Sequence, residues 1–95
     1  MIQRPIKILE FYNTGLLFLT NTGEKRSIEL EKVILEQYRT RVLDKDQFTK
    51  AKIEEFGQIF WENQAFMKDL KGNEILCEYD ISPEFLMTHS VRVLS

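Results

Sequence analysis

The side chains best suited to covalent or metal chemistry are a single cysteine and a single histidine. Cys77 and His89 are the only residues of their types in the 95-residue chain. A structural zinc site normally takes four Cys or His ligands, with pairs of them closely spaced. Cys77 lies in the apolar segment Ile75–Tyr79, where a cysteine more often serves as a small buried hydrophobic side chain. We therefore expect no metal, no cofactor and no catalytic residue.

Acidic residues are the next candidates, because two carboxylates at a suitable separation perform acid–base catalysis. Neighbouring residues of a strand point to opposite faces, so Glu54 and Glu55 do not converge. With 15 Asp and Glu residues in the chain, some carboxylates lie close together by chance. We expect these two and the later Glu62, Glu78 and Asp80 to be solvated surface groups. A small enzyme that uses Cys77 or these carboxylates is the least favoured alternative.

Basic residues gather between positions 39 and 50. Arg39, Arg41, Lys45 and Lys50 would form a patch for nucleic acid if the segments that carry them lie together. Acidic residues are interspersed among them, and the whole chain has a net charge of −2, whereas nucleic-acid-binding domains are more often basic. A nucleic-acid-associated regulator is therefore the second interpretation, and direct binding to nucleic acid is not favoured.

Composition predicts a folded domain. The chain is 43% hydrophobic and 12% aromatic, enough for one core. A single cysteine forms no internal disulfide, and no apolar run is long enough for a signal peptide or a membrane span. We expect a soluble, cytoplasmic protein without membrane contact, in which residues 1–95 form a single domain.

The segment Ile53–Trp61 is predicted to form the centre of the structure. It contains Phe56-Gly57, and glycine takes the positive φ that tight hairpin turns need. Alternation along the two flanking strands places Ile53, Ile59 and Trp61 on one face. Trp61 is the only tryptophan, so we expect it at the centre of the core.

Further strands are predicted on both sides of this hairpin. Turn residues separate three segments rich in β-branched and aromatic residues before residue 31, which suggests an antiparallel meander. A later Lys-Gly-Asn turn joins two more strands into another hairpin. The predicted strands are Ile6–Tyr12, Leu16–Thr20, Lys25–Leu30, Ala65–Leu70 and Glu74–Asp80.

Two segments are predicted to be helical. Apolar residues at spacings of three and four predict a main helix at Glu31–Val42. Ser82-Pro83-Glu84 provides a serine cap, a proline at the first helical position and an acid in the first turn of a short helix. The expected fold is α+β: a mostly antiparallel sheet of about five strands, with one main helix packed on one face and short helical turns.

The order of these features resembles a small bacterial family, Domain of Unknown Function 2442. The resemblance extends over nearly the whole chain. Its most specific part is the hairpin Phe56-Gly57-Gln58-Ile59-Phe60-Trp61, followed by Asp80-Ile81-Ser82-Pro83 before a final helical turn. The chain differs from typical members at Met67–Tyr79, which adds an extra hairpin.

The resemblance implies no activity and no catalytic residues, since none is established for the family. Some members are fused to, or encoded beside, a helix-turn-helix domain or another small protein, as in toxin–antitoxin pairs. We expect no room for a helix-turn-helix after the last helix of this chain. The resemblance therefore implies an antitoxin-like or regulatory member of a small bacterial protein pair.

Aromatic residues outside the predicted core favour a binding surface. Phe56, Phe60 and Phe66 do not all share the face of Trp61, and an exposed apolar patch in a small protein usually marks a partner site. The first hypothesis is a non-enzymatic interaction domain. It would bind a small protein, or form a homodimer, through Phe60, Phe66 and an exposed sheet face or strand edge.

Overall fold

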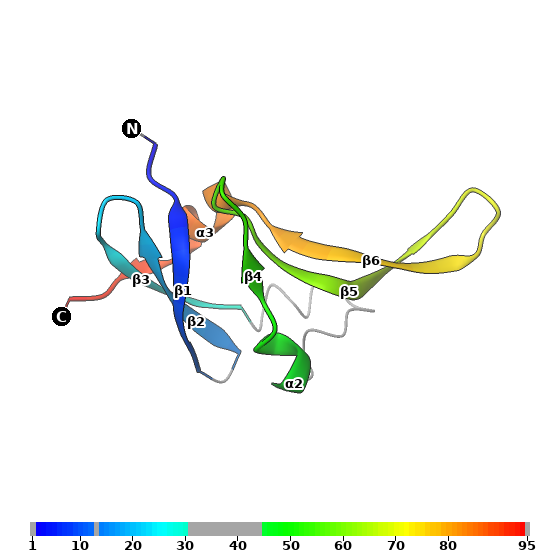
Figure 1. Ribbon diagram of the computed structural model, residues 1–95, viewed down its shortest axis with the longest axis horizontal. Coiled ribbons are helices and arrows are strands. Elements are labelled where there is room, and N and C mark those ends of the chain that lie inside the picture. The colour runs from blue at the N-terminus through cyan, green and yellow to red at the C-terminus, as the bar shows by residue number, and fades with distance from the viewer. Residues whose placement is uncertain (1, 13, 31–44, 95) are drawn as a thin grey trace.

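The computed structural model describes residues 2–12, 14–30 and 45–94, with the backbone alone at residues 45, 63–67 and 76. Most of the described residues lie in strands (Figure 1). In chain order, the elements are β1 (Pro5–Tyr12), β2 (Gly15–Thr20), β3 (Lys25–Glu29), α2 (Lys45–Phe48), β4 (Lys52–Ile53), β5 (Ile59–Lys68), β6 (Glu74–Ile81), α3 (Pro83–His89) and β7 (Val91–Arg92).

The first sheet, sheet A, has the strand order β1-β2-β3-β7. Its first three strands form the antiparallel meander that the turn residues predict. The most apolar strand, β2, lies between β1 and β3, and Leu16 and Phe18 are fully buried. The short C-terminal strand β7 pairs antiparallel with β3, with Val91 opposite Ser27.

The second sheet, sheet B, has the order β4-β5-β6, and its first two strands form the predicted central hairpin. Gly57 has a φ of 95° at the turn, so the prediction of a positive φ is confirmed. A Cβ at Gly57 would lie 2.9 Å from the Cβ of Arg4 and 3.1 Å from the carbonyl oxygen of Pro5. Glycine therefore also allows the turn to approach the start of β1.

Trp61 lies in the core, as predicted, with no exposed surface. Its ring stacks on Phe48 at a centroid distance of 5.8 Å and contacts Tyr79 at 5.7 Å. The indole Nε1 donates a hydrogen bond of 2.8 Å to the carbonyl of Phe48, which satisfies its one polar group. The core cluster contains side chains from both sheets and from α2 and α3.

The α+β prediction was wrong: the structure is mostly β, with two antiparallel sheets instead of one. The described helices, α2 and α3, have only four and seven residues, and neither is a main helix packed on a sheet. The predicted helix Glu31–Val42 lies outside the described residues. The physical reason is that the apolar faces of both sheets join one core, so each sheet helps to cover the other.

A long hairpin formed by β5 and β6 extends from the core along the longest axis of the molecule (Figure 1), whose extents are 49 × 28 × 19 Å. The register is regular from Ile59 to Trp61 and again from Ala65, with an irregularity between them. We call the outer part, residues 65–77, the arm. Its turn is closed by the Asp69 carboxylate, which accepts hydrogen bonds of 2.9 Å from the amides of Lys71 and Asn73. The arm confirms the predicted second hairpin.

The short helix α3 also begins as its sequence predicts. Ser82 is the N-cap, and its Oγ accepts a hydrogen bond from the amide of Phe85 at 3.2 Å. Pro83 follows at the first helical position. In the part of the chain that the structure describes, no helix is long and apolar enough to cross a membrane.

Candidate functional site

The outer face of sheet B carries the most distinctive group of side chains. The strand register places Lys52, Phe60 and Asp80 in one row across β4, β5 and β6. Since Ile59 and Trp61 are buried in the core, Phe60 between them points to the opposite face. Phe60 is half-buried there.

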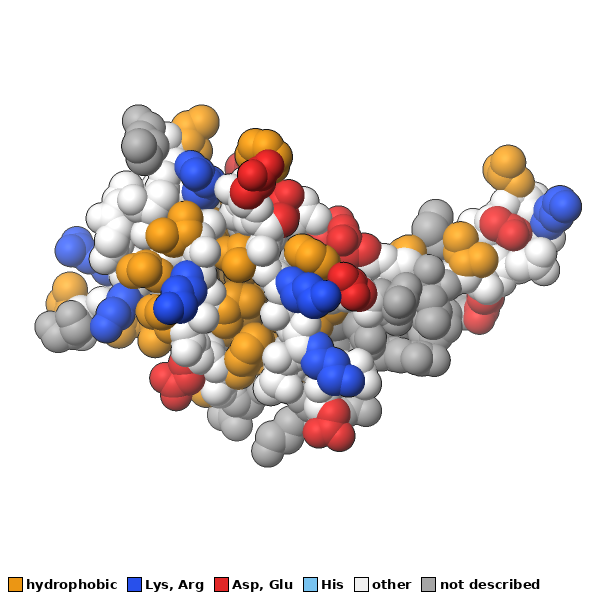
Figure 2. All heavy atoms as spheres, in the orientation of Figure 1, with side chains coloured by type: hydrophobic (Ala, Val, Ile, Leu, Met, Phe, Trp, Pro, Cys, Tyr) orange, Lys and Arg blue, Asp and Glu red, His pale blue; other side chains and the backbone are white. Residues whose placement is uncertain are grey.

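Carboxylates surround this row. The pKa of Glu78 is raised above its ordinary value, first by desolvation and then by a hydrogen bond to Asp80 and the negative charges of Asp80, Glu62 and Glu54. Figure 2 shows acidic side chains over this part of the molecule. We call the group the acidic face; it consists of Glu54, Phe60, Glu62, Glu78 and Asp80.

Two polar contacts hold side chains on the acidic face. Lys52 Nζ lies 3.0 Å from Glu62 Oε1 in an exposed ion pair. Gln58 Nε2 lies 3.5 Å from Glu78 Oε2. The first contact joins β4 to β5, and the second joins the turn between them to β6.

The outer edge of β6 adjoins the acidic face. β6 pairs with β5 on one side, and no described strand pairs with its other side. Its sequence, Glu-Ile-Leu-Cys-Glu-Tyr-Asp-Ile, contains three acids and no Lys or Arg. An edge strand offers backbone N–H and C=O groups to another chain. The edge and the acidic face together are the candidate site.

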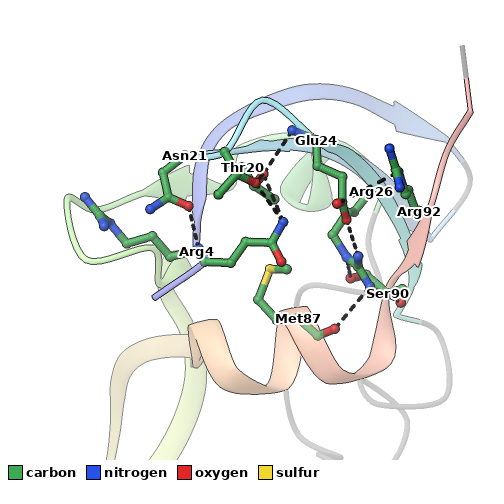
Figure 3. A network of polar contacts seen from close by, with 10 residues as sticks. Arg4, Thr20, Asn21, Glu24, Arg26, Met87, Ser90 and Arg92 are labelled. Carbon is green, nitrogen blue, oxygen red and sulfur yellow. Dashed lines mark hydrogen bonds and ion pairs between the residues drawn. The ribbon is translucent and has the colours of Figure 1, made fainter. Parts of the chain in front are cut away.

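A separate polar network joins α3 to sheet A (Figure 3). Arg26 Nε donates to Ser90 Oγ at 2.7 Å, and its Nη2 donates to the carbonyl oxygens of Ser90 at 2.9 Å and Met87 at 3.3 Å. Arg26 also pairs with Glu24, and this hydrogen bond is the main cause of a lowered pKa at Glu24. The donors of Arg26 are thus directed at the end of α3, which is a structural role.

Of the residues considered for catalysis, Glu54, Glu62, Glu78 and Asp80 lie together on the acidic face, whereas Cys77 and His89 lie on separate elements. Cys77 is half-buried in β6. His89 lies at the end of α3, with its ring 4.1 Å from that of Phe85. Across residues 2–12, 14–30 and 45–94, no three His, Cys, Asp or Glu side chains are arranged to hold a metal ion.

The other predicted site residues are only partly described. Phe66 pairs with Leu76 in the arm, and its backbone alone is described. Arg39 and Arg41 lie outside the described residues, Lys45 is described by its backbone at the start of α2, and Lys50 is exposed after that helix. The predicted basic patch is therefore not assembled by the side chains that the structure describes.

An open depression of about 490 Å³ lies near the turn of the β4–β5 hairpin. Ile2 and Phe56 are its most exposed apolar residues, at 86% and 69%. Arg4 Nε donates to the carbonyl oxygen of Glu55 at 3.3 Å and so helps to hold the turn. The depression is lined by Ile2, Gln3, Arg4, Phe56, Pro83 and Glu84.

The acidic face was not predicted, because its acids are scattered along the sequence. The alternation Phe60-x-Glu62 on β5 and Glu78-x-Asp80 on β6 does contain the signal, since residues two apart share a face. Only the strand register, which places Phe60 opposite Asp80, brings these two pairs of residues together. That pairing joins residues twenty positions apart in the sequence.

The fold and this surface define a mostly β protein with two antiparallel sheets, a long hairpin and an acidic strand edge. No protein-family model, curated protein or solved structure matches the chain.

Proposed function

We propose that this protein is a non-enzymatic interaction domain that binds a small protein partner through the β6 edge and the neighbouring acidic face. The observation that supports this most directly is the outer edge of β6, eight residues long, with no described strand beside it. Such an edge is a template for strand addition, in which backbone hydrogen bonds give affinity. Membership of the Domain of Unknown Function 2442 family, and an antitoxin-like or regulatory role in a bacterial pair, are part of the same proposal.

The arm supports the proposal in a second way. A two-stranded hairpin alone is marginally stable in water, and further strands or another packed element stabilise it. Leu70 at the tip of the arm is fully exposed and Ile75 is 43% exposed. A partner strand on β6 would convert the hairpin into a three-stranded sheet and cover part of this surface.

The test compares the full chain with a variant that lacks the arm. Residues 66–76 are replaced by Asn-Gly, which joins the directly paired residues Ala65 and Cys77 by a two-residue turn. Trp61 and Tyr79 are kept, so the core and its tryptophan fluorescence are expected to remain. Both tagged chains are expressed in the native cell, purified, and analysed by size-exclusion chromatography with light scattering.

We expect a stoichiometric small protein with the full chain and its loss with the arm-deleted variant. A folded variant that retains the same partner would contradict binding at the arm. A full chain that is isolated as a monomer without any partner would contradict the proposed function itself. Circular dichroism of both proteins provides the control for folding.

A further inference from the structure

We propose that the partner segment is an extended strand with lysine or arginine at alternate positions, which adds to the outer edge of β6. The inference rests on the proposed function and specifies the chemistry of the partner. It follows from the backbone geometry of the edge, the charge of β6, and the poor fit of a second copy of the chain.

The backbone of the β6 edge is fixed where it adjoins the core. Residues 79–81 of β6 pair with residues 59–61 of β5. The side chains of Ile59 and Trp61 are fully buried. This part of the edge is therefore held in place by the core and needs little ordering when another strand binds. Side chains at every second position of an added strand would lie on the same face of sheet B as Phe60 and Asp80.

The negative charge of β6 favours basic residues on the added strand. Glu78 and Asp80 are exposed, lie two positions apart, and share the outer face with Glu62. Opposite charges on neighbouring strands stabilise a sheet, whereas like charges directly opposite each other destabilise it. Cations at alternate positions of the added strand would lie beside Glu78 and Asp80 of the neighbouring strand.

A second copy of the chain is a poor occupant of the same edge. In an antiparallel pair of β6 strands centred on Cys77, Glu74 lies opposite Asp80 of the second copy. No register can place an acid of β6 opposite a Lys or Arg of the second β6, because the strand contains three acids and neither basic residue. The acids that attract a basic strand therefore also oppose pairing of β6 with itself.

The probe is a fluorescein-labelled peptide of nine residues that alternates lysine and valine. Binding to the full-length protein is measured by fluorescence anisotropy at low and high salt. The first control peptide replaces every lysine with glutamate. The second keeps the lysines and carries N-methyl groups on alternate backbone amides, which removes the hydrogen bonds of strand addition and leaves the charge unchanged.

We expect the lysine–valine peptide to bind, with an affinity that falls as salt rises. The glutamate peptide and the N-methylated peptide should bind at least about tenfold more weakly, a difference of about 1.4 kcal/mol. Equal binding of the N-methylated peptide would show diffuse charge attraction and overturn strand addition. Absence of binding by the lysine–valine peptide at low salt would also overturn the inference.

A pair of protein variants locates the site. Glu78→Gln with Asp80→Asn should weaken the peptide about three- to tenfold, the effect of two cross-strand charge pairs. Glu10→Gln with Glu84→Gln removes two exposed charges from β1 and α3 and should leave binding unchanged. Equal weakening by both pairs would contradict a site at β6.

The failure of this inference can be distinguished from the failure of the proposed function. If the peptide does not bind but arm-dependent capture of a native partner persists, the partner chemistry is wrong and the interaction domain stands. If the arm-deleted chain keeps its partner, binding at the arm is contradicted; if the full chain is isolated without any partner, the proposed function fails whatever the peptide does.

Discussion

At the scale of single residues, Glu78 has the most informative electrostatic environment. Desolvation and the neighbouring carboxylates of Asp80, Glu62 and Glu54 raise its pKa. Lys52 pairs with Glu62 on the same face and offsets part of this repulsion. The ionised form of Glu78 therefore destabilises the folded protein, and this destabilisation reaches its full size at a pH above the raised pKa.

The resulting prediction concerns Glu78→Gln. At neutral pH the variant should have the higher melting temperature, by about 1–3 °C, since an exposed charge contributes a few tenths of a kcal/mol. As pH falls through the raised pKa towards the ordinary value of 4.5, the folded wild type binds a proton before the unfolded chain does. The advantage of the variant should then disappear.

The measurement is thermal unfolding by circular dichroism between pH 4 and pH 8, with Glu10→Gln as the control. Other carboxylates, such as Glu24 and Asp69, have lowered pKa values and lose stabilising contacts as pH falls. They affect wild type and variant alike, so the comparison cancels their contribution. A constant difference between the two proteins over the whole range would contradict repulsion at Glu78.

At the scale of elements, Arg26 holds the end of α3 against β3. Its side chain is 17% exposed and its nitrogens reach two carbonyl oxygens and a hydroxyl. The planar guanidinium can serve these acceptors together, whereas the single ammonium of lysine cannot. We therefore expect Arg26→Lys to destabilise the protein by about 1–2 kcal/mol although it keeps the charge.

Urea unfolding followed by Trp61 fluorescence measures this loss. The matched control is Arg92→Lys, because Arg92 is 67% exposed and its Nε lies 3.9 Å from Glu24 Oε2. The control should change the free energy of unfolding by less than about 0.5 kcal/mol. Equal effects at both positions would show that the guanidinium contacts of Arg26 contribute little beyond charge.

The elements that the sequence predicts correctly are those defined by local interactions. Gly57 at the hairpin turn and Ser82 at the start of α3 act within a few residues of the backbone that they shape. The second sheet was not predicted, because it depends on which apolar faces pack together. The acidic face was not predicted for a similar reason: the pairing of Phe60 with Asp80 and the irregular register after Trp61 are long-range features.

At the scale of the whole molecule, the chain is more extended than a compact domain of its length. Its radius of gyration is 13.9 Å, compared with about 12.4 Å expected for a globular chain of this size. The long hairpin of β5 and β6 accounts for this shape in Figure 1. The same hairpin thus contains the core pairing at Trp61 and, in its turn, the exposed Leu70.

This arrangement predicts unequal local stability along one pair of strands. Amides near Ile59–Trp61 and Tyr79–Ile81 pair within the buried core and should exchange with solvent only through large-scale unfolding. Amides at the tip of the arm should exchange about 100-fold faster or more, because a two-stranded hairpin is marginally stable. Hydrogen exchange monitored by mass spectrometry resolves the two regions, with β2 as an internal reference for the core.

The same measurement relates this difference in stability to binding. Addition of the lysine–valine peptide should slow exchange in β6 and leave β2 unchanged, since an added strand protects the edge that it pairs with. If the arm is as strongly protected as the core before any peptide is added, then the hairpin folds as one cooperative unit with the core. In that case the arm would not gain stability from a partner strand, and its role as a docking element that a partner stabilises would be contradicted.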